Sequence, residues 1–160
     1  MQPRPAARML PLAEHHRHLE RTFEDLVRKA TDGDPAELRS CWLGFESELL
    51  AHLDYEEAEL LPGFEERAPH EAAAIRREHE EIRAVLLEMG INLDLHLMRL
   101  ESVRDFVMKL RAHANREEES FYAWAATSPQ ATSHFKGFSD RLVGIATKVG
   151  KTGLAKADLL

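Results

Sequence analysis

The 160-residue sequence contains a single cysteine, Cys41, so it cannot form a disulfide within the chain. Disulfides persist in oxidising compartments, and a chain without one fits a reducing compartment. Cys41 lies beside Trp42 in an apolar stretch, whereas a reactive thiol needs an electropositive, partly exposed setting. We therefore expect Cys41 to pack in the core rather than act as a nucleophile.

Long apolar runs and basic clusters are also missing. No apolar run approaches the roughly 18 residues of a membrane-spanning helix, and residues 1–30 show no charged-then-apolar signal sequence. The formal net charge is -7, and the Lys and Arg residues are interleaved with acids, which argues against a nucleic-acid-binding groove. These absences predict a cytoplasmic protein with no membrane span and no nucleic-acid partner.

Runs of β-branched residues are scarce, while Leu, Ala, Glu and Arg dominate, which is a helical composition. The length suggests one domain. Apolar residues at helical spacing predict helices at about residues 10–32, 34–61, 69–90 and 94–124, and a fifth at 130–149. We therefore predict an all-α, up-down-up-down four-helix bundle over residues 10–126, an N-terminal arm at 1–9, and a C-terminal helix and tail at 127–160.

The helix limits are read from local signals. Gly33 is a stop signal, and Asp34 followed by Pro35 is a helix start, with Asp as the N-cap and Pro in the first turn. Pro62 with the following glycine predicts a break and a connector at 64–68, and Gly90 predicts an end with a tight link at 91–93.

Two histidine and glutamate pairs carry the functional signal: His52 with Glu56, and His113 with Glu117. Residues four apart on a helix stand about 40° apart on one face, one turn above the other. Each pair can therefore act as a nitrogen and oxygen chelate, and this ligand set suits a non-haem iron or manganese centre. One such pair would carry little weight, so the repetition needs an explanation.

Two further histidines are predicted to face the bundle core. At 100° per residue, the apolar centre of the first helix lies about 35° from His16, about 65° from His15 and about 125° from His18. The apolar centre of the third helix lies within about 50° of His79, while His70 projects from the opposite side. The histidines interpreted as ordinary core or surface residues are His15, His18, His70, His96 and His134.

These histidines form an internal repeat of two helical hairpins. His16 precedes His52 by 36 residues, and His79 precedes His113 by 34; each hairpin carries a histidine on its first helix and the histidine and glutamate pair on its second. In each pair of adjacent glutamates the first, Glu56 or Glu117, shares the apolar face. The second, Glu57 or Glu118, points about 100° further round, which leaves it to solvent or to a supporting role behind a ligand.

This combination resembles the haemerythrin-like, or His-His-Glu cation-binding, domain family over roughly residues 10–125. The resemblance implies two non-haem iron ions, joined by an oxo or hydroxo bridge derived from solvent. The residues that it places around the iron ions are His16 and His52 on one, His79 and His113 on the other, and Glu56 and Glu117 as bridges.

The sequence departs from the oxygen-carrying haemerythrins one turn after His79. Those proteins place a further histidine there, and this chain has Arg83. The departure leaves an open iron position for water, an added ligand or another carboxylate, for which Glu20 and Glu48 are the nearest candidates, and it weakens the case for reversible oxygen carriage.

Several alternatives remain at this stage. Ferritin-like bundles use Glu-x-x-His, the reverse of the order found here, and structural zinc sites usually include closely spaced cysteines.

The expected function is binding or sensing of O2, NO or a related small ligand at the open iron position. The rivals are an enzyme acting on peroxide or nitric oxide, and an iron donor for cluster repair, although repair-type relatives carry an N-terminal cysteine segment that is missing here. Iron storage or a protein interaction through the C-terminal segment is a third class, and the oligomeric state is open.

Overall fold

The computed structural model describes residues 10–129 and 131, and over them the chain is all-α, as predicted. The predicted N-terminal arm and most of residues 127–160, including the expected fifth helix, lie outside the described residues. In chain order the elements are α1 (Leu10–Asp32), α2 (Pro35–Tyr55), η2 (Glu56–Leu60), α3 (Leu61–Arg67), α4 (Pro69–Asp94), α5 (Leu100–Arg116), η3 (Glu117–Phe121) and α6 (Tyr122–Thr127).

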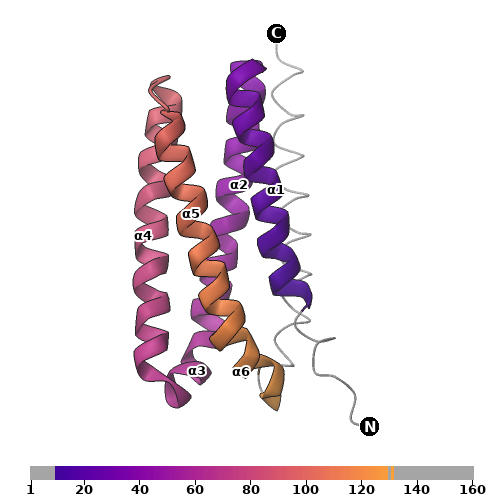
Figure 1. The fold of residues 1–160 in the computed structure, drawn as a ribbon, viewed down its shortest axis with the longest axis vertical. Coiled ribbons are helices and arrows are strands. Elements are labelled where there is room, and N and C mark those ends of the chain that lie inside the picture. The colour runs from indigo at the N-terminus through magenta and orange to yellow at the C-terminus, as the bar shows by residue number, and fades with distance from the viewer. Residues whose placement is uncertain (1–9, 130, 132–160) are drawn as a thin grey trace, which may run out of the picture.

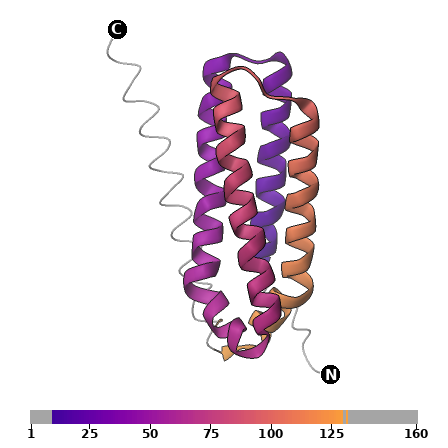
Figure 2. The ribbon, with the colours of Figure 1, turned by 90° about the vertical axis from the view of Figure 1, so that its left-hand side faces the viewer.

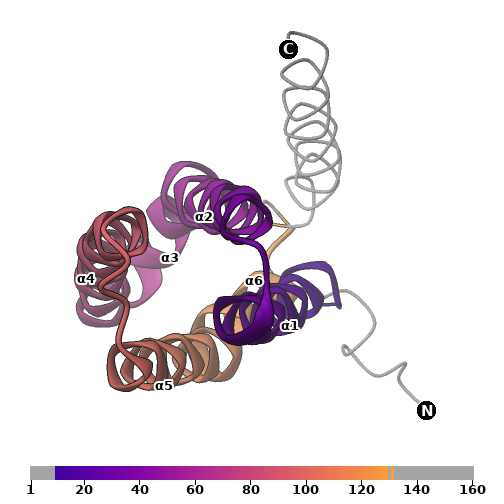
Figure 3. The ribbon, with the colours of Figure 1, turned by 90° about the horizontal axis from the view of Figure 1, so that it is seen from above.

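The four long helices α1, α2, α4 and α5 run side by side along the long axis of the molecule (Figures 1 and 2). Seen from above, they occupy the four corners of a bundle, and each contacts its two neighbours (Figure 3). Successive long helices run in opposite directions, which confirms the predicted up-down-up-down bundle. The short helices α3 and α6 lie together at one end (Figure 1). None of the helices in the described ranges is both long and apolar enough to cross a membrane.

The junction between α1 and α2 follows the sequence signals. The Gly33 N–H donates to the Lys29 carbonyl over 2.8 Å, and α2 begins at Pro35. The Asp34 carboxylate accepts a hydrogen bond from the Ala36 N–H over 3.1 Å, which satisfies one of the free donors at the helix start. This part of the local prediction is confirmed.

The predicted break at Pro62 is wrong, because the chain stays helical from η2 into α3. Pro62 lies in the first turn of α3, where its missing N–H removes no helical hydrogen bond. The expected connector is largely helix, and its Phe64 is buried against the rings of Phe121 and Trp124. A Cβ on Gly63 would lie 3.0 Å from Trp124, so this glycine permits the close approach of the indole.

The predicted end at Gly90 is also wrong, since α4 continues to Asp94. A Cβ on Gly90 would lie 3.2 Å from the Trp42 indole nitrogen. The glycine therefore serves helix packing rather than helix termination. The link to α5 covers residues 95–99 instead, and His96 within it adopts a left-handed φ of 57°.

Two apolar clusters fill the bundle, one above the other. The first apolar cluster is made of Leu19, Phe23, Leu26, Trp42, Phe45, Leu49, Leu53, Ile82, Leu86, Met89, Leu93, Val103 and Phe106. The second apolar cluster, towards α3 and α6, is made of Leu12, Tyr55, Leu60, Leu61, Phe64, Ala72, Ile75, Phe121, Tyr122, Ala125 and Ala131. Cys41 packs against the first cluster, so the structure agrees with a packing role for the thiol.

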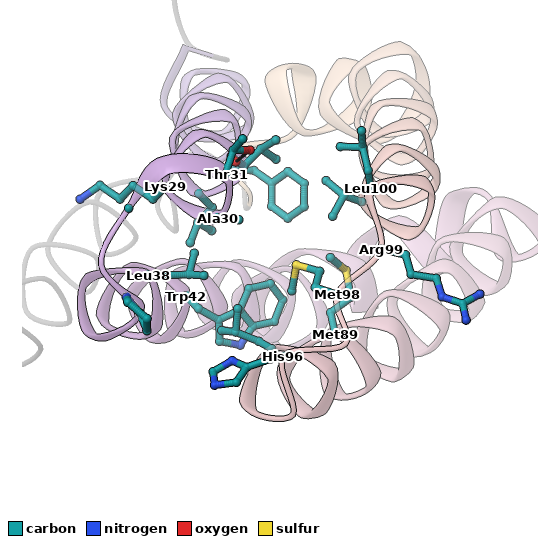
Figure 4. Close-up of a pocket in the computed structure, with 17 residues that line it drawn as sticks. Lys29, Ala30, Thr31, Leu38, Trp42, Met89, His96, Met98, Arg99 and Leu100 are labelled. Carbon is teal, nitrogen blue, oxygen red and sulfur yellow. Dashed lines mark hydrogen bonds between the residues drawn. The ribbon is translucent and has the colours of Figure 1, made fainter.

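At the end of the bundle away from α3 and α6, a cavity of about 330 Å³ lies beside the first apolar cluster. Figure 4 shows Met89, Met98 and Leu100 around it, while the charged ends of Lys29 and Arg99 point away from its centre. The cavity is therefore an apolar space without convergent polar groups.

Candidate metal centre

A layer of polar side chains separates the two apolar clusters. Along α1, His16 lies between Leu12 of the second cluster and Leu19 of the first, and along α4, His79 lies between Ile75 and Ile82 in the same way. The layer contains all six predicted site residues, namely His16, His52, Glu56, His79, His113 and Glu117. All are buried except His16, whose side chain is 10% exposed. Burial of so many ionisable groups is costly unless they neutralise one another or hold cations.

The two carboxylates in this layer each face histidines of both hairpins. Glu117 Oε1 lies 3.1 Å from both His79 Nε2 and His113 Nε2, and Glu117 Oε2 lies 3.2 Å from His16 Nε2. Glu56 Oε1 lies 3.3 Å from His52 Nε2, and Glu56 Oε2 lies 3.5 Å from His79 Nε2. All four imidazoles thus turn Nε2 towards the carboxylates.

This geometry produces two overlapping groups of potential metal ligands. One group is His16, His52, Glu56 and Glu117; the other is Glu56, His79, His113 and Glu117. Within each group the ligand atoms lie within 4.8 Å of one another. Because both glutamates belong to both groups, the cluster could hold two cations side by side, with a carboxylate oxygen for each.

Two buried atoms in this layer have no hydrogen-bond partner within the described part of the chain: Glu56 Oε2 and His113 Nε2. His113 Nε2 lies 3.1 Å from Glu117 Oε1, which is an ion-pair distance. Buried polar atoms are rarely left without a partner. The donor set and these two atoms therefore fit a cation better than a network of hydrogen bonds alone.

Each of the two shared glutamates opens a five-residue π-helical turn: Glu56 is the first residue of η2, and Glu117 is the first residue of η3. The backbone N–H of the residue five positions on, Leu61 or Tyr122, donates to the glutamate carbonyl. Such turns insert an extra residue into a helix and occur frequently at functional sites. The insertion brings the fifth residue round towards the face of the glutamate.

Tyr122 is a site residue that the sequence pattern did not reveal. Its buried hydroxyl donates to Glu56 Oε1 and lies 3.3 Å from Glu117 Oε2. The same oxygen lies 3.1 Å from His16 Nε2 and 3.3 Å from His52 Nε2. The matching position in the first hairpin is Leu61, so the two halves of the site differ here. The phenol oxygen lies on the side of His16 and His52.

The second glutamate of each pair supports a histidine of the other hairpin. Glu57 Oε1 lies 2.8 Å from His79 Nδ1, and Glu118 Oε1 lies 3.4 Å from His16 Nδ1. A carboxylate on the outer ring nitrogen fixes the tautomer and leaves Nε2 free to bind a metal. Of the two roles expected for these glutamates, the structure therefore favours support of a histidine over simple exposure to solvent.

Arg83, which stands one turn after His79, pairs with two carboxylates of the first hairpin, and the open iron position stays a prediction. Its guanidinium donates to Glu57 Oε1 over 2.7 Å and to Asp54 Oδ1 over 2.8 Å. Arg83 thereby holds the Glu57 carboxylate against His79. The arginine keeps the pKa of Glu57 below its usual range although burial opposes this.

The two carboxylates expected to fill an open position lie elsewhere. Glu20 pairs with Arg111, and Glu48 Oε2 lies 2.8 Å from His18 Nε2. Neither belongs to the two ligand groups found among the described residues. In the metal-free structure both carboxylates therefore have partners outside the ligand groups, and water or an added ligand is the alternative that the sequence left open for this position.

His15 is buried in the core, and it makes a contact that the sequence pattern did not reveal. Its Nδ1 lies 2.9 Å from His52 Nδ1, so it supports His52 in the position that carboxylates occupy behind the other histidines. Burial lowers the pKa of His15 to about 4, which keeps the ring neutral. The apolar face of a helix is at least about 100° wide, and adjacent residues can both lie at its edges.

The two central carboxyl groups have opposite pKa shifts in the metal-free protein. Burial, with the neighbouring Glu117 charge, raises the pKa of Glu56 to about 8. Burial also opposes the ionisation of Glu117, but His113 and its other histidine partners hold the Glu117 pKa well below its usual value. At neutral pH, Glu117 is therefore ionised while Glu56 keeps its proton, so the two adjacent buried carboxyl groups do not both carry a negative charge.

Two histidines of the layer have raised pKa values. Burial alone would lower the pKa of His16, but the Glu117 and Glu118 carboxylates outweigh it and raise the pKa to about 9. Burial likewise opposes the charge on His113, and Glu117 and Glu78 raise that pKa to about 10. In the metal-free protein, protons therefore supply the positive charge that cations would supply in a loaded site.

A four-helix bundle with histidines and glutamates converging from facing helices belongs to the class of bundle proteins that hold metal ions in the core. The family described as Hemerythrin HHE cation binding domain matches residues 11–125. The chain therefore belongs to this family, and the resemblance seen in the sequence is confirmed. No curated protein and no solved structure matches the chain.

Proposed function

We propose that this protein holds two non-haem iron ions and binds or senses O2, NO or a related small ligand at one of them. His16 and His52 would hold one ion, His79 and His113 the other, and Glu56 and Glu117 would bridge the pair. The single observation that carries the proposal is that both glutamates are shared by two overlapping ligand groups. When bound, iron supplies redox chemistry and an exchangeable coordination position.

The donor atoms favour iron over zinc. The two groups contain imidazole and carboxylate donors and no thiolate, and this set suits non-haem iron or manganese. Structural zinc sites, by contrast, usually include cysteine sulfur. Each ligand group has four protein residues, two of which are shared, so added ligands have room to complete the coordination of each ion.

The direct test is to load the protein with iron, reduce it without oxygen, and expose it to O2, NO or peroxide. We expect about two irons per chain, near-ultraviolet absorption in the oxidised form, and a stable adduct that is reversed by removing the ligand. Absorption spectra over repeated exposure measure this. Rapid consumption of peroxide or NO over many turnovers would instead establish the rival enzyme, and a chain that binds no iron would refute the proposal.

Replacing Tyr122 with phenylalanine gives a second expected result. In the iron-free protein the change removes the donor to the buried Glu56, and we expect a loss of about 1–3 kcal/mol in the free energy of unfolding. In the iron-loaded protein the loss should be smaller, because the cations give Glu56 a partner. Urea unfolding of both forms measures the difference; equal losses would mean that the hydroxyl and the metal do not share this carboxylate.

A further inference from the structure

A pocket of about 220 Å³ opens between α1 and α5 and reaches the metal centre. Three proposed ligands, His16, His52 and His113, line it; they come from both hairpins. The walls are apolar and are formed by Leu19, Phe23, Leu49, Leu53, Val107 and Leu110. A small molecule can therefore reach ligands of both iron ions along this pocket without displacing a helix.

On two other faces of the metal centre, ion pairs hold the side chains behind the histidines. Between α2 and α4, Arg83 holds Glu57 over His79. Between α4 and α5, Arg116 Nε donates over 2.6 Å to Glu78, whose other oxygen lies 2.9 Å from His113 Nδ1. In both cases a carboxylate held by an arginine contacts the outer nitrogen of a histidine. At the face between α1 and α5, where the two helices lie side by side (Figures 1 and 3), a pocket meets the imidazoles.

An ion pair spans the outer end of this pocket. The Arg111 guanidinium on α5 donates to the Glu20 carboxylate on α1, and its Nη2 lies 3.9 Å from Glu24. The Arg111 side chain is 56% exposed and that of Glu20 is 37% exposed. Exposed pairs of this kind contribute little stability, and exposed side chains change rotamer within nanoseconds. The pair can therefore open readily and close again.

The charges at the mouth are not equally available to a ligand. Glu118 is engaged with His16 Nδ1, and Glu20 is engaged with Arg111. Arg17, which also lines the pocket, is exposed. A small anion can replace the Glu20 carboxylate on the Arg111 guanidinium. The anion and the carboxylate both offer negatively charged acceptor atoms to the guanidinium N–H groups. A neutral molecule makes no such exchange.

We propose that this pocket is the entrance to the metal centre, and that the Arg111 guanidinium, held by Glu20, speeds the entry of small inorganic monoanions while uncharged ligands enter independently of this ion pair. This inference rests on the proposed function, because it requires a ligand-binding metal at the inner end. Arg111 attracts the anion to the mouth, and Glu20 competes with the anion for the guanidinium. The apolar walls then favour a small ligand over a bulky hydrated one.

Azide and NO test the charge of the entrance, because azide is an anion at neutral pH and NO is uncharged. We would follow azide binding to the oxidised protein and NO binding to the reduced protein by stopped-flow absorption. Arg111→Gln should slow azide association about threefold to tenfold at low salt, and Glu20→Gln should speed it by a similar factor. Both effects should nearly vanish at about 1 M salt. NO association should stay unchanged in both variants.

Lys109→Gln and Glu81→Gln are the matched controls. This pair also joins neighbouring helices near the surface, but neither residue lines the pocket. Each control changes the net charge by the same amount as the corresponding test variant, so unspecific charge effects cancel. The proposed role of the Arg111–Glu20 pair would be overturned by either of two results. One is azide association in the test variants at the rates of the controls, and the other is an equal change in the azide and NO rates.

The route itself is tested by filling the pocket. Ala114 lines it and is half-buried, and Ala114→Phe should slow azide and NO association alike, by about tenfold or more, at unchanged iron content. Unchanged rates for both ligands would overturn the route. An unmodified protein that holds two irons but forms no adduct with azide or NO would refute the proposed function instead, and the entrance with it.

Discussion

Glu117→Ala is expected to abolish stable iron binding, whereas Glu118→Ala should retain most of the iron and Glu119→Ala all of it. The three glutamates are consecutive, yet their environments differ. Glu117 is fully buried and faces three histidines. Glu118 contacts the outer nitrogen of His16, and Glu119 is exposed.

The expected magnitudes follow from those environments. Loss of a residue behind a ligand typically lowers metal affinity about 10–100-fold, so a Glu118→Ala protein should still fill at saturating iron. Loss of Glu117 removes one proposed ligand from each of the two ions at once, so it should cost more than about 100-fold and empty both positions. His113 belongs to only one of the two ligand groups, so His113→Ala should empty the position that it shares with His79 and lower the iron content less than Glu117→Ala does.

Iron per chain after gel filtration, read together with near-ultraviolet absorption, measures this series. Far-ultraviolet circular dichroism shows whether each variant keeps its helices, and Glu117→Gln repeats the test with a side chain of nearly equal volume. Undiminished iron in Glu117→Ala and Glu117→Gln would refute the proposed ligand set. Equal losses of iron in the Glu117 and Glu118 variants would contradict the assignment of Glu117, rather than Glu118, as the glutamate that faces the metal.

Helix periodicity was sufficient to place the six core residues, because it depends only on the angle between successive side chains. The pattern chose Glu56 over Glu57 and Glu117 over Glu118, and the structure has the first of each pair buried and the second half-buried. The same periodicity predicted that His16 and His79, on two separate helices, face the core. The assignment of these residues as ligands stays a prediction.

Periodicity could not find Tyr122 or the role of His15. In a regular helix the fifth residue after Glu117 would lie about 140° away from it, and only the π-helical turn brings the phenol to the site. His15 is buried because α2 supplies His52 and Glu48 beside it. Such contacts depend on how neighbouring helices pack, which one helix pattern does not contain.

The two misplaced helix limits have the same origin. A proline or glycine has a local preference, and tertiary packing decided against it at both positions. Gly90 lies against the Trp42 indole within α4, and Pro62 occupies a first helical turn that follows directly on η2. The π-helical turn at η2 shifts the register just before Pro62, which is why a proline there is compatible with continuous helix.

Removing both irons should lower the melting temperature by about 20 °C at neutral pH. A ligand present at about 1,000 times its dissociation constant stabilises the native state by about 4 kcal/mol, so two such ions contribute about 8 kcal/mol, and about 2–4 °C per kcal/mol applies to a domain of this size. The physical reason is that the metal-free core retains Glu56, Glu117 and four imidazoles with only protons to balance them. Thermal unfolding before and after chelation, and again after iron is restored, measures the change.

The gap between the iron-loaded and iron-free proteins should widen as pH rises. Glu56, His16 and His113 have raised pKa values of about 8, 9 and 10, so each binds its proton more tightly in the folded iron-free protein than in the unfolded chain. Their stabilising contributions are complete below the unfolded pKa values and are lost as pH rises through the folded ones. The iron-free melting temperature should therefore fall between about pH 7 and 9.

The iron-loaded protein should change less over that interval, because bound cations replace those protons. Comparing both forms at each pH cancels the titration of every group outside the metal centre. The opposite shift of Glu117 does not affect this window, since its lowered pKa matters only in acid. A gap that stays constant or narrows towards pH 9 would show that metal and protons do not compete for these side chains, and the proposed ligand set would fail.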